Sequence, residues 1–246
     1  RGGALAVSGA AGEIFRNYFY LPDRPARTRD VVDAFYSFFD PADCTAEFDA
    51  AAFLARVDEK LRRALGVEAE RQDRLTIESA YTLFRCPPAF GREISMVGRF
   101  GAYFVPFCEH VVAREAANIP VRWRTHGLFQ SKLLERVGPR LAAYPSAYGH
   151  SFVEPPTWRH RVSDGISLYR PTWLRRYSFR MKRALSRSPD PRTGFFAPPY
   201  LSRTIDLDFP VMSRFFKMPR LSAPEHFAAA ATLEYLGRHF SDRIAG

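Results

Sequence analysis

The chain has 246 residues, of which 46% are hydrophobic and 25% are charged, an ordinary balance for a globular protein. This composition excludes a disordered or fibrous chain, and no apolar run approaches the roughly 20 residues of a membrane-spanning helix. The formal net charge of +10 arises largely between Arg159 and Arg187. Because no signal peptide is recognisable at the start, we expect a cytoplasmic protein.

The first predicted element is a short strand, Leu5–Val7, whose apolar residues are typical of a buried strand in a parallel sheet. A chain seldom starts inside a core element, so we expect an upstream part of the protein to precede Arg1. From this strand onward the sequence predicts helices almost throughout. The expected helices cover residues 29–39, 45–65, 71–85, 92–104, 107–118 and 128–137.

Cap residues and prolines predict where some of these helices begin and end. Thr45 is a candidate cap for the second helix, and Pro87 and Pro88 are expected to end the third. The apolar face predicted for the second helix carries Phe53, Val57, Leu61 and Leu65.

The C-terminal part of the chain predicts a loop and one more helix. Residues 188–199 are rich in proline and indicate an extended loop. Ser222 and Glu225 form a capping box for a helix that runs to about Phe240. Leu233, Leu236 and Phe240 share one face of that helix.

The three cysteines, Cys44, Cys86 and Cys108, are widely spaced. Their odd number and spacing match neither a disulfide framework nor a zinc cluster. We expect reduced thiols in or near the core.

The first candidate site follows the predicted strand and reads Ser8-Gly9-Ala10-Ala11-Gly12-Glu13-Ile14-Phe15-Arg16. A small-residue loop between a strand and a helix lets backbone N–H groups approach a phosphate, and an acid in the loop can hold Mg²⁺ against pyrophosphate. The alternative is a tight strand-to-helix turn without a ligand.

Two further segments give this loop a context. Residues 105–120 read Val-Pro-Phe-Cys-Glu-His-Val-Val-Ala-Arg-Glu-Ala-Ala-Asn-Ile-Pro, which resembles the V-P-F-L-D, L-V-E-x-A and L-P segment of asparagine synthetases. Residues 126–134, followed by Pro139, are similar to the glycine, lysine and leucine-rich helix of that family. In the same order, residues 8–15 look like a shortened S-G-E-G-x-D-E-x-F loop. The resemblance covers about residues 5–150.

The resemblance implies an ATP-dependent carbon–nitrogen ligase, in which MgATP activates a carboxylate as an acyl-adenylate and ammonia or an amine attacks it. It implies the helical C-terminal part of a Rossmann-like α/β domain of the adenine nucleotide alpha hydrolase type, with one or few parallel strands. The nucleotide-binding residues that it implies are Ser8, Gly9, Gly12, Glu13 and Lys132, with Glu13 near the metal.

The sequence also departs from the family pattern. Ala10 replaces the first carboxylate of the loop, and Ala102 and Phe104 replace the glutamate and arginine before V-P-F. Residues 144–152 contain no lysine where the family has one for the adenylate chemistry, and the S-G-G-x-D-S pyrophosphate loop is absent. Because these groups carry proton transfer and charge neutralisation, the sequence indicates an incomplete or degenerate site.

Several polar residues allow a second interpretation. Lys132, beside Leu133 and Leu134, also fits a solvated helix face. His126 and His150 flank the region of resemblance, and His150 could replace the charge of the missing lysine or be a surface histidine. Glu109, His110 and Glu115 lack the spacing of a zinc-binding helix.

Residues 158–187 interleave aromatic residues with nine arginines and lysines against one acid, Asp164. Such a segment can bind single-stranded nucleic acid or an anionic membrane surface or acidic partner. The third interpretation is a cationic helix whose aromatic side packs on the domain.

The sequence therefore predicts two parts. Residues 1–150 form the C-terminal part of an asparagine synthetase-like domain, and residues 151–246 form a basic, aromatic-rich helical extension. The predicted function is a fragment or degenerate member of the amidoligases, inactive alone and completed by a missing N-terminal half. The alternatives are a non-catalytic nucleotide- or protein-binding domain and a basic binding module.

Overall fold

The computed structural model describes residues 5–146, 150–185, 196–221 and 224–244. The protein is mainly helical, with 63% helix and 5% strand, as the sequence predicts. The chain divides into two compact units, the first made of Arg1–Tyr36 and Val57–Trp173, the second of Ser37–Arg56 and Leu174–Gly246. The boundary expected after His150 lies within the first unit. No helix in the described ranges is long and apolar enough to cross a membrane.

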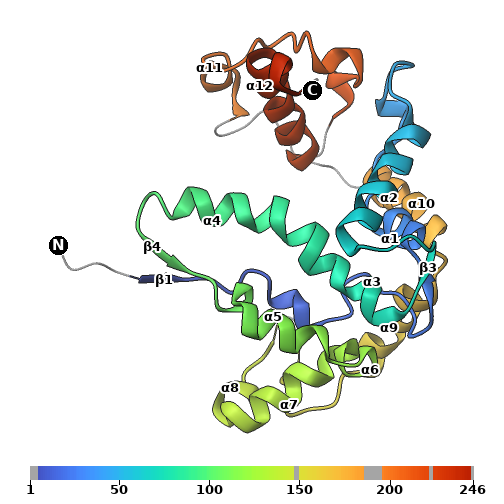
Figure 1. The fold of residues 1–246 in the computed structure, drawn as a ribbon, viewed down its shortest axis with the longest axis vertical. Helices are drawn as coiled ribbons and strands as arrows, with labels where there is room; N and C mark the ends of the chain where they lie inside the picture. The colour runs from blue at the N-terminus through green and yellow to red at the C-terminus, as the bar shows by residue number, and fades with distance from the viewer. Residues whose placement is uncertain (1–4, 147–149, 186–195, 222–223, 245–246) are drawn as a thin grey trace. The chain divides into compact units, whose positions relative to one another are not determined.

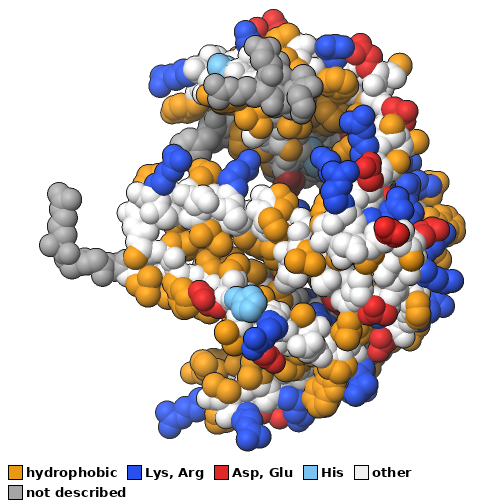
Figure 2. All heavy atoms as spheres, in the orientation of Figure 1, with side chains coloured by type: hydrophobic (Ala, Val, Ile, Leu, Met, Phe, Trp, Pro, Cys, Tyr) orange, Lys and Arg blue, Asp and Glu red, His pale blue; other side chains and the backbone are white. Residues whose placement is uncertain are grey.

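The first unit contains a parallel pair of strands, β1 (Leu5–Val7) and β4 (Ala102–Phe104), in which Ala6 pairs with Tyr103 (Figure 1). The parallel direction agrees with the sequence-based expectation, but the expected burial of β1 is wrong. Leu5 and Val7 are 60% and 64% exposed, and within the described residues β1 pairs with β4 alone. Figure 2 shows hydrophobic side chains gathered on the surface over these strands.

Strand β4 lies where the sequence predicts the end of a helix. Helix α4 (Arg92–Val97) ends where Gly98 donates its N–H to the carbonyl oxygen of Ile94. Beyond it, the aromatic residues Tyr103 and Phe104 favour an extended backbone beside β1. The helical prediction for residues 102–104 is therefore wrong.

Pro87 and Pro88 do not end the preceding helix. Helix α3 (Arg74–Ala80) continues through π-helical turns at Tyr81–Arg85 and Pro87–Gly91 into α4, and Figure 1 shows one continuous helix. The wider π-helical turn pairs each N–H with the carbonyl five residues earlier, as Cys86 does with Tyr81. Such turns accommodate proline rings that would clash with the carbonyls of a regular α-helix.

The remaining strands, β2 (Ala26–Arg27) and β3 (Arg71–Gln72), pair in antiparallel fashion. Helix α1 (Thr28–Phe35) follows β2, and α2 (Ala50–Leu65) begins five residues later than predicted. Asp49 caps α2 by accepting bonds of 2.9 Å from the N–H groups of Ala51 and Ala52. The predicted cap Thr45 instead donates its hydroxyl to the carbonyl oxygen of Arg214. The buried residues of the helix include Leu54 and Leu61, whereas Phe53 is exposed.

Short helices follow β4 in the first unit. They are α5 (His110–Ala117), α6 (Val121–Arg124), α7 (Leu128–Val137) and α8 (Pro139–Ala142). The bounds of α7 are those predicted from the sequence. Helices α9 (Trp158–Tyr169) and α10 (Thr172–Leu185) carry the basic segment.

The second unit has its own core, in which α11 (Pro198–Leu201) and α12 (Pro224–Ile244) take part. Phe227, Ala230 and Ala231 of α12 are buried there, whereas Leu233 and Phe240 of the predicted face are exposed. Of the loop predicted over residues 188–199, residues 188–195 lie outside the described residues, as does the predicted cap Ser222. Pro198 already belongs to α11.

Candidate functional site

The turn after β1 is fixed by its own backbone. Ser8 donates its N–H to the carbonyl oxygen of Phe104 at 3.0 Å. The hydroxyl of Ser8 accepts a 3.1 Å bond from the N–H of Ala10, and Gly12 donates its N–H to the carbonyl oxygen of Gly9 at 3.2 Å. Ala11 takes a left-handed conformation with φ of 64°. The N–H groups of Ala10 and Gly12 are therefore used inside the turn.

The helix expected after this turn is a single 3-10 turn, Gly12–Phe15, and the backbone becomes extended at Arg16. A helix of one turn has a small dipole, so it contributes little to anion binding. Any ligand must therefore be held mainly by side chains around the turn.

Glu13 is the acid that the turn presents. Its Oε2 accepts a 2.9 Å hydrogen bond from the hydroxyl of Tyr81. Tyr81 is buried and belongs to the long helix that runs from α3 through the π-helical turns into α4. Burial raises the pKa of Tyr81 above its ordinary value, so this hydroxyl stays a donor at neutral pH. The bond fixes one carboxylate oxygen of Glu13.

A cavity of about 340 Å³ lies beside the turn, within the size range of small-molecule sites. We name it the turn cavity. It is lined by Gly9, Gly12, Glu13, Phe15, Arg16, Phe107, Gln130, Leu133, Leu134 and Phe152. Its walls are therefore mostly apolar, with Glu13, Arg16 and Gln130 as the polar side chains.

Close packing makes the contact of a side chain at Gly12 tight. A Cβ there would lie 3.3 Å from the ring of Phe107, which meets Phe15 edge to face at a centroid distance of 5.5 Å. Phe15 also stacks on Phe129 at 5.2 Å. The glycine thus lets the turn approach the segment after β4.

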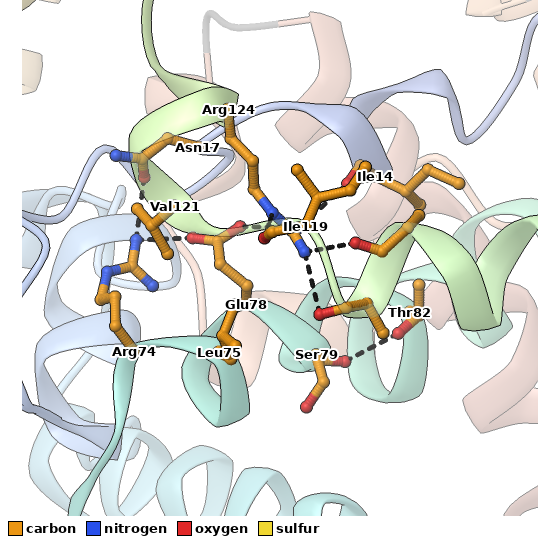
Figure 3. Close-up of polar contacts among 12 residues, drawn as sticks. Ile14, Asn17, Arg74, Leu75, Glu78, Ser79, Thr82, Ile119, Val121 and Arg124 are labelled. Carbon is orange, nitrogen blue, oxygen red and sulfur yellow. Dashed lines mark hydrogen bonds and ion pairs between the residues drawn. The ribbon is translucent and has the colours of Figure 1, made fainter. Parts of the chain in front are cut away.

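A buried charge network holds the turn against the helices (Figure 3). The guanidinium of Arg124 donates to the carbonyl oxygen of Ile14 at 2.9 Å and to carbonyl oxygens at the end of α5, including that of Ala116. Oε2 of Glu78 lies 3.9 Å from Nη1 of Arg124, and Oε1 of Glu78 lies 2.5 Å from Nη2 of Arg74. Burial lowers the pKa of Arg124, and Glu78 opposes that shift.

Arg74 completes this network on the other side. It donates to Oδ1 of Asn17 at 2.8 Å (Figure 3). It also donates to the carbonyl oxygen of Pro22 at 3.1 Å. The network therefore connects the segment after the turn to α3, α5 and α6. Through the bond to the carbonyl oxygen of Ile14, it also holds the backbone next to Glu13.

Lys132 does not join the turn. It lies on another face of α7, pairs with Glu135 at 2.9 Å and lines a second cavity of about 430 Å³, which we name the His126 cavity. His150 lines the same cavity and is buried, with Nδ1 2.8 Å from the carbonyl oxygen of Ser151. The structure thus gathers Gly9, Gly12 and Glu13 at one cavity and places Lys132 at another. Ser8 supports the turn through its hydroxyl.

No sequence signal points to Tyr81 or Gln130, because both occupy helical positions and the direction in which each side chain faces depends on its neighbours in the fold. The described residues contain no group of three or more histidine, cysteine, aspartate or glutamate side chains that could hold a metal ion. A role of Glu13 toward Mg²⁺ would therefore depend on oxygens from a bound phosphate.

The packed-helix interpretation holds in part for α10, where Phe179 stacks on Phe38 at 5.4 Å, but not for α9. In α9, Trp158, Val162, Ile166 and Tyr169 are 70%, 51%, 63% and 75% exposed. Arg159 lies over the ring of Trp158 at 5.6 Å. In α10, Arg176 and Arg180 lie 5.1 and 5.5 Å from the ring centroid of Tyr177, and Arg175 is buried.

Comparison with protein-family models, with curated proteins and with solved structures returned no match.

Proposed function

We propose that the turn cavity binds an adenine nucleotide, and that the protein is a degenerate relative of the asparagine synthetase-like amidoligases. One observation carries this proposal. The cavity lies beyond the carboxyl ends of both parallel strands, since Gly9 and Glu13 follow β1 and Phe107 follows β4. In open parallel α/β sheets, ligands bind at this end of the strands. A Rossmann-like origin of the strand pair belongs to the same proposal.

The lining suits the two halves of a nucleotide. The rings of Phe15, Phe107 and Phe152 offer apolar surface to a base. Arg16 can neutralise a phosphate, and Glu13 can hold Mg²⁺ together with phosphate oxygens. When bound, MgATP would supply the activated phosphates.

The same lining supports binding more than catalysis. Ala10 stands where the family has a carboxylate, and Arg16 is the one cation among the lining residues. Transfer of an adenylyl group needs several positive groups to stabilise the developing charge. We therefore propose nucleotide binding without turnover by these residues alone.

Thermal unfolding with and without ATP, AMP and Mg²⁺ tests this proposal. A ligand at 100 times its Kd stabilises the folded state by about 2.7 kcal/mol, which raises Tm by several degrees. Leu133→Trp should fill the cavity and abolish the rise, whereas Val137→Trp, an exposed position on the same helix outside the lining, should leave it unchanged. No rise with any of these ligands would refute the proposal.

A second candidate function rests on the exposed face of α9. Trp158, Val162, Ile166 and Tyr169 recur with helical spacing and form an apolar stripe, next to Arg159. We propose that this stripe binds an anionic membrane surface, because aliphatic residues insert among acyl chains but do not stack on bases.

Binding to vesicles of anionic phospholipid tests this second function. Trp158 fluorescence should shift to the blue with anionic vesicles and not with neutral ones, and Ile166→Ser should weaken binding while Val137→Ser should not. Binding to a single-stranded oligonucleotide that survives Ile166→Ser would point to nucleic acid and overturn the membrane assignment.

A further inference from the structure

The His126 cavity, about 430 Å³ in volume, has a chemistry different from that of the turn cavity. Its lining comes from α6, α7, α9 and the segments between them, all within the first unit. Its basic and imidazole side chains that the proposal below uses are those of Arg122, His126, Lys132 and Arg161. Gly9, Gly12 and Glu13 do not line it.

His126 is held by an acid from another helix. Its Nδ1 lies 2.9 Å from Oδ2 of Asp164 on α9. When Nδ1 donates its proton to this carboxylate, Nε2 is left as a hydrogen-bond acceptor. Within the described ranges of the chain, no side chain or carbonyl bonds to Nε2 of His126.

The backbone at His126 is also unusual. Its φ of 56° and ψ of 22° lie in the left-handed region, which is disfavoured for a residue with a side chain. Such conformations persist where the surrounding structure requires them, and they cluster at ligand sites. Here the conformation places the imidazole in the wall of the cavity while Asp164 orients it.

The charges of the lining favour an anion. Arg122, Lys132 and Arg161 face two acids, Glu135 and Glu154. Lys132 is paired with Glu135 at 2.9 Å. In the part of the chain that the structure describes, Arg122 and Arg161 form no ion pair. Two arginines without an acidic partner, at one cavity, suit the bidentate binding of phosphate oxygens.

We propose that the His126 cavity binds a small hydroxylated anion of the sugar-phosphate class. Arg122 and Arg161 bind the phosphate group, and Nε2 of His126 accepts a hydrogen bond from a sugar hydroxyl. The cavity volume lies within the range of roughly 300–1,000 Å³ for small-molecule sites.

The proposal is tested by titrating the whole chain with ribose 5-phosphate, while the imidazole resonances of His126 are followed by NMR. The resonances should shift in a saturable way, and ribose 5-phosphate should bind at least tenfold more tightly than inorganic phosphate. Ribose alone should not bind. Absence of a saturable shift would overturn the proposal, and so would equal affinity for inorganic phosphate, because the hydroxyl contact would then add nothing.

Two variants locate the phosphate. The double variant Arg122→Ser, Arg161→Ser should weaken ribose 5-phosphate binding at least tenfold, since both charge-assisted contacts are lost. Arg140→Ser, at an exposed arginine of α8 that does not line the cavity, should change binding less than twofold. Equal effects of the two changes would refute the assignment. Leu133→Trp in the turn cavity should leave this titration unchanged, so the two proposals fail independently.

Discussion

The hydroxyl of Tyr81 donates a 2.9 Å hydrogen bond to Oε2 of Glu13, and this bond joins the long helix to the turn after β1. It links two residues that are 68 positions apart in the chain. Because the donor is buried and the acceptor is the acid of the turn cavity, the bond supports the fold and orients the candidate site at the same time.

Tyr81→Phe should therefore lower the free energy of unfolding by about 1–2 kcal/mol, since it removes a hydrogen bond to a charged group without changing the ring. Urea unfolding measures this change. Tyr103→Phe, which removes an exposed 3.3 Å bond to Glu93, is the matched control and should cost less than about 0.5 kcal/mol. Similar losses in the free energy of unfolding for both variants would show that the buried Tyr81 bond stabilises the fold no more than the exposed Tyr103 bond.

The charge network behind the turn gives the largest expected loss. Arg124→Met leaves Glu78 beside one arginine and leaves the carbonyl oxygens of Ile14 and Ala116 without this donor. Breaking a buried ion pair from one side costs about 3–5 kcal/mol. Arg122→Met, on the same helix but exposed, should change the free energy of unfolding little. Chemical denaturation measures the free energy of unfolding of both variants. A loss below about 1 kcal/mol for Arg124→Met would contradict a stabilising role of the charge network.

In the second unit, Glu234 is fully buried and accepts hydrogen bonds from the N–H groups of Val211 at 3.0 Å and Met212 at 2.8 Å. Glu234→Ala leaves both N–H groups unpaired in the core and should destabilise the unit by about 2–3 kcal/mol. Glu225→Ala, exposed in the first turn of α12, should cost about 0.3–1 kcal/mol. Hydrogen exchange at the amides of Val211 and Met212 reports the change locally. Unaltered protection of these amides would argue against their hydrogen bonds to Glu234.

Asp73 should make stability depend on pH. Its carboxylate accepts bonds from the hydroxyl and N–H of Thr76 and from the N–H of Leu75, and these bonds lower the pKa of Asp73 below its ordinary value. A lowered folded-state pKa stabilises the fold above the unfolded-state pKa of about 3.9, and the contribution disappears as pH falls through the folded-state pKa. Asp73→Asn should thus be destabilising at pH 7 and nearly neutral at the acid end of the range. A constant difference across pH would exclude this origin.

The sequence predicted elements where local signals are strong. The bounds of α7, Leu128–Val137, follow from an apolar pattern set between Gly127 and Gly138. The prediction failed where contacts between residues far apart in the chain determine the local structure. Strand β4 exists because β1 lies beside it, and the prolines at 87 and 88 are carried by π-helical turns that no local pattern reveals.

The candidate site was predictable in part. Gly9, Gly12 and Glu13 stand in a small-residue turn after a strand, which the sequence shows directly. Tyr81, which fixes Glu13, comes from a helix that is held beside the turn by long-range contacts such as the bond from Arg74 to Asn17, 57 positions away. A local sequence pattern does not report such contacts.

Photolabelling with 8-azido-ATP, followed by mass spectrometry of the labelled peptides, tests most directly whether the cavity beyond the strand ends holds a nucleotide. Label that ATP competes away should fall on peptides containing Phe15 or Phe107, which line the turn cavity and not the His126 cavity. Label confined to other peptides, or label that excess ATP does not remove, would contradict nucleotide binding at this cavity.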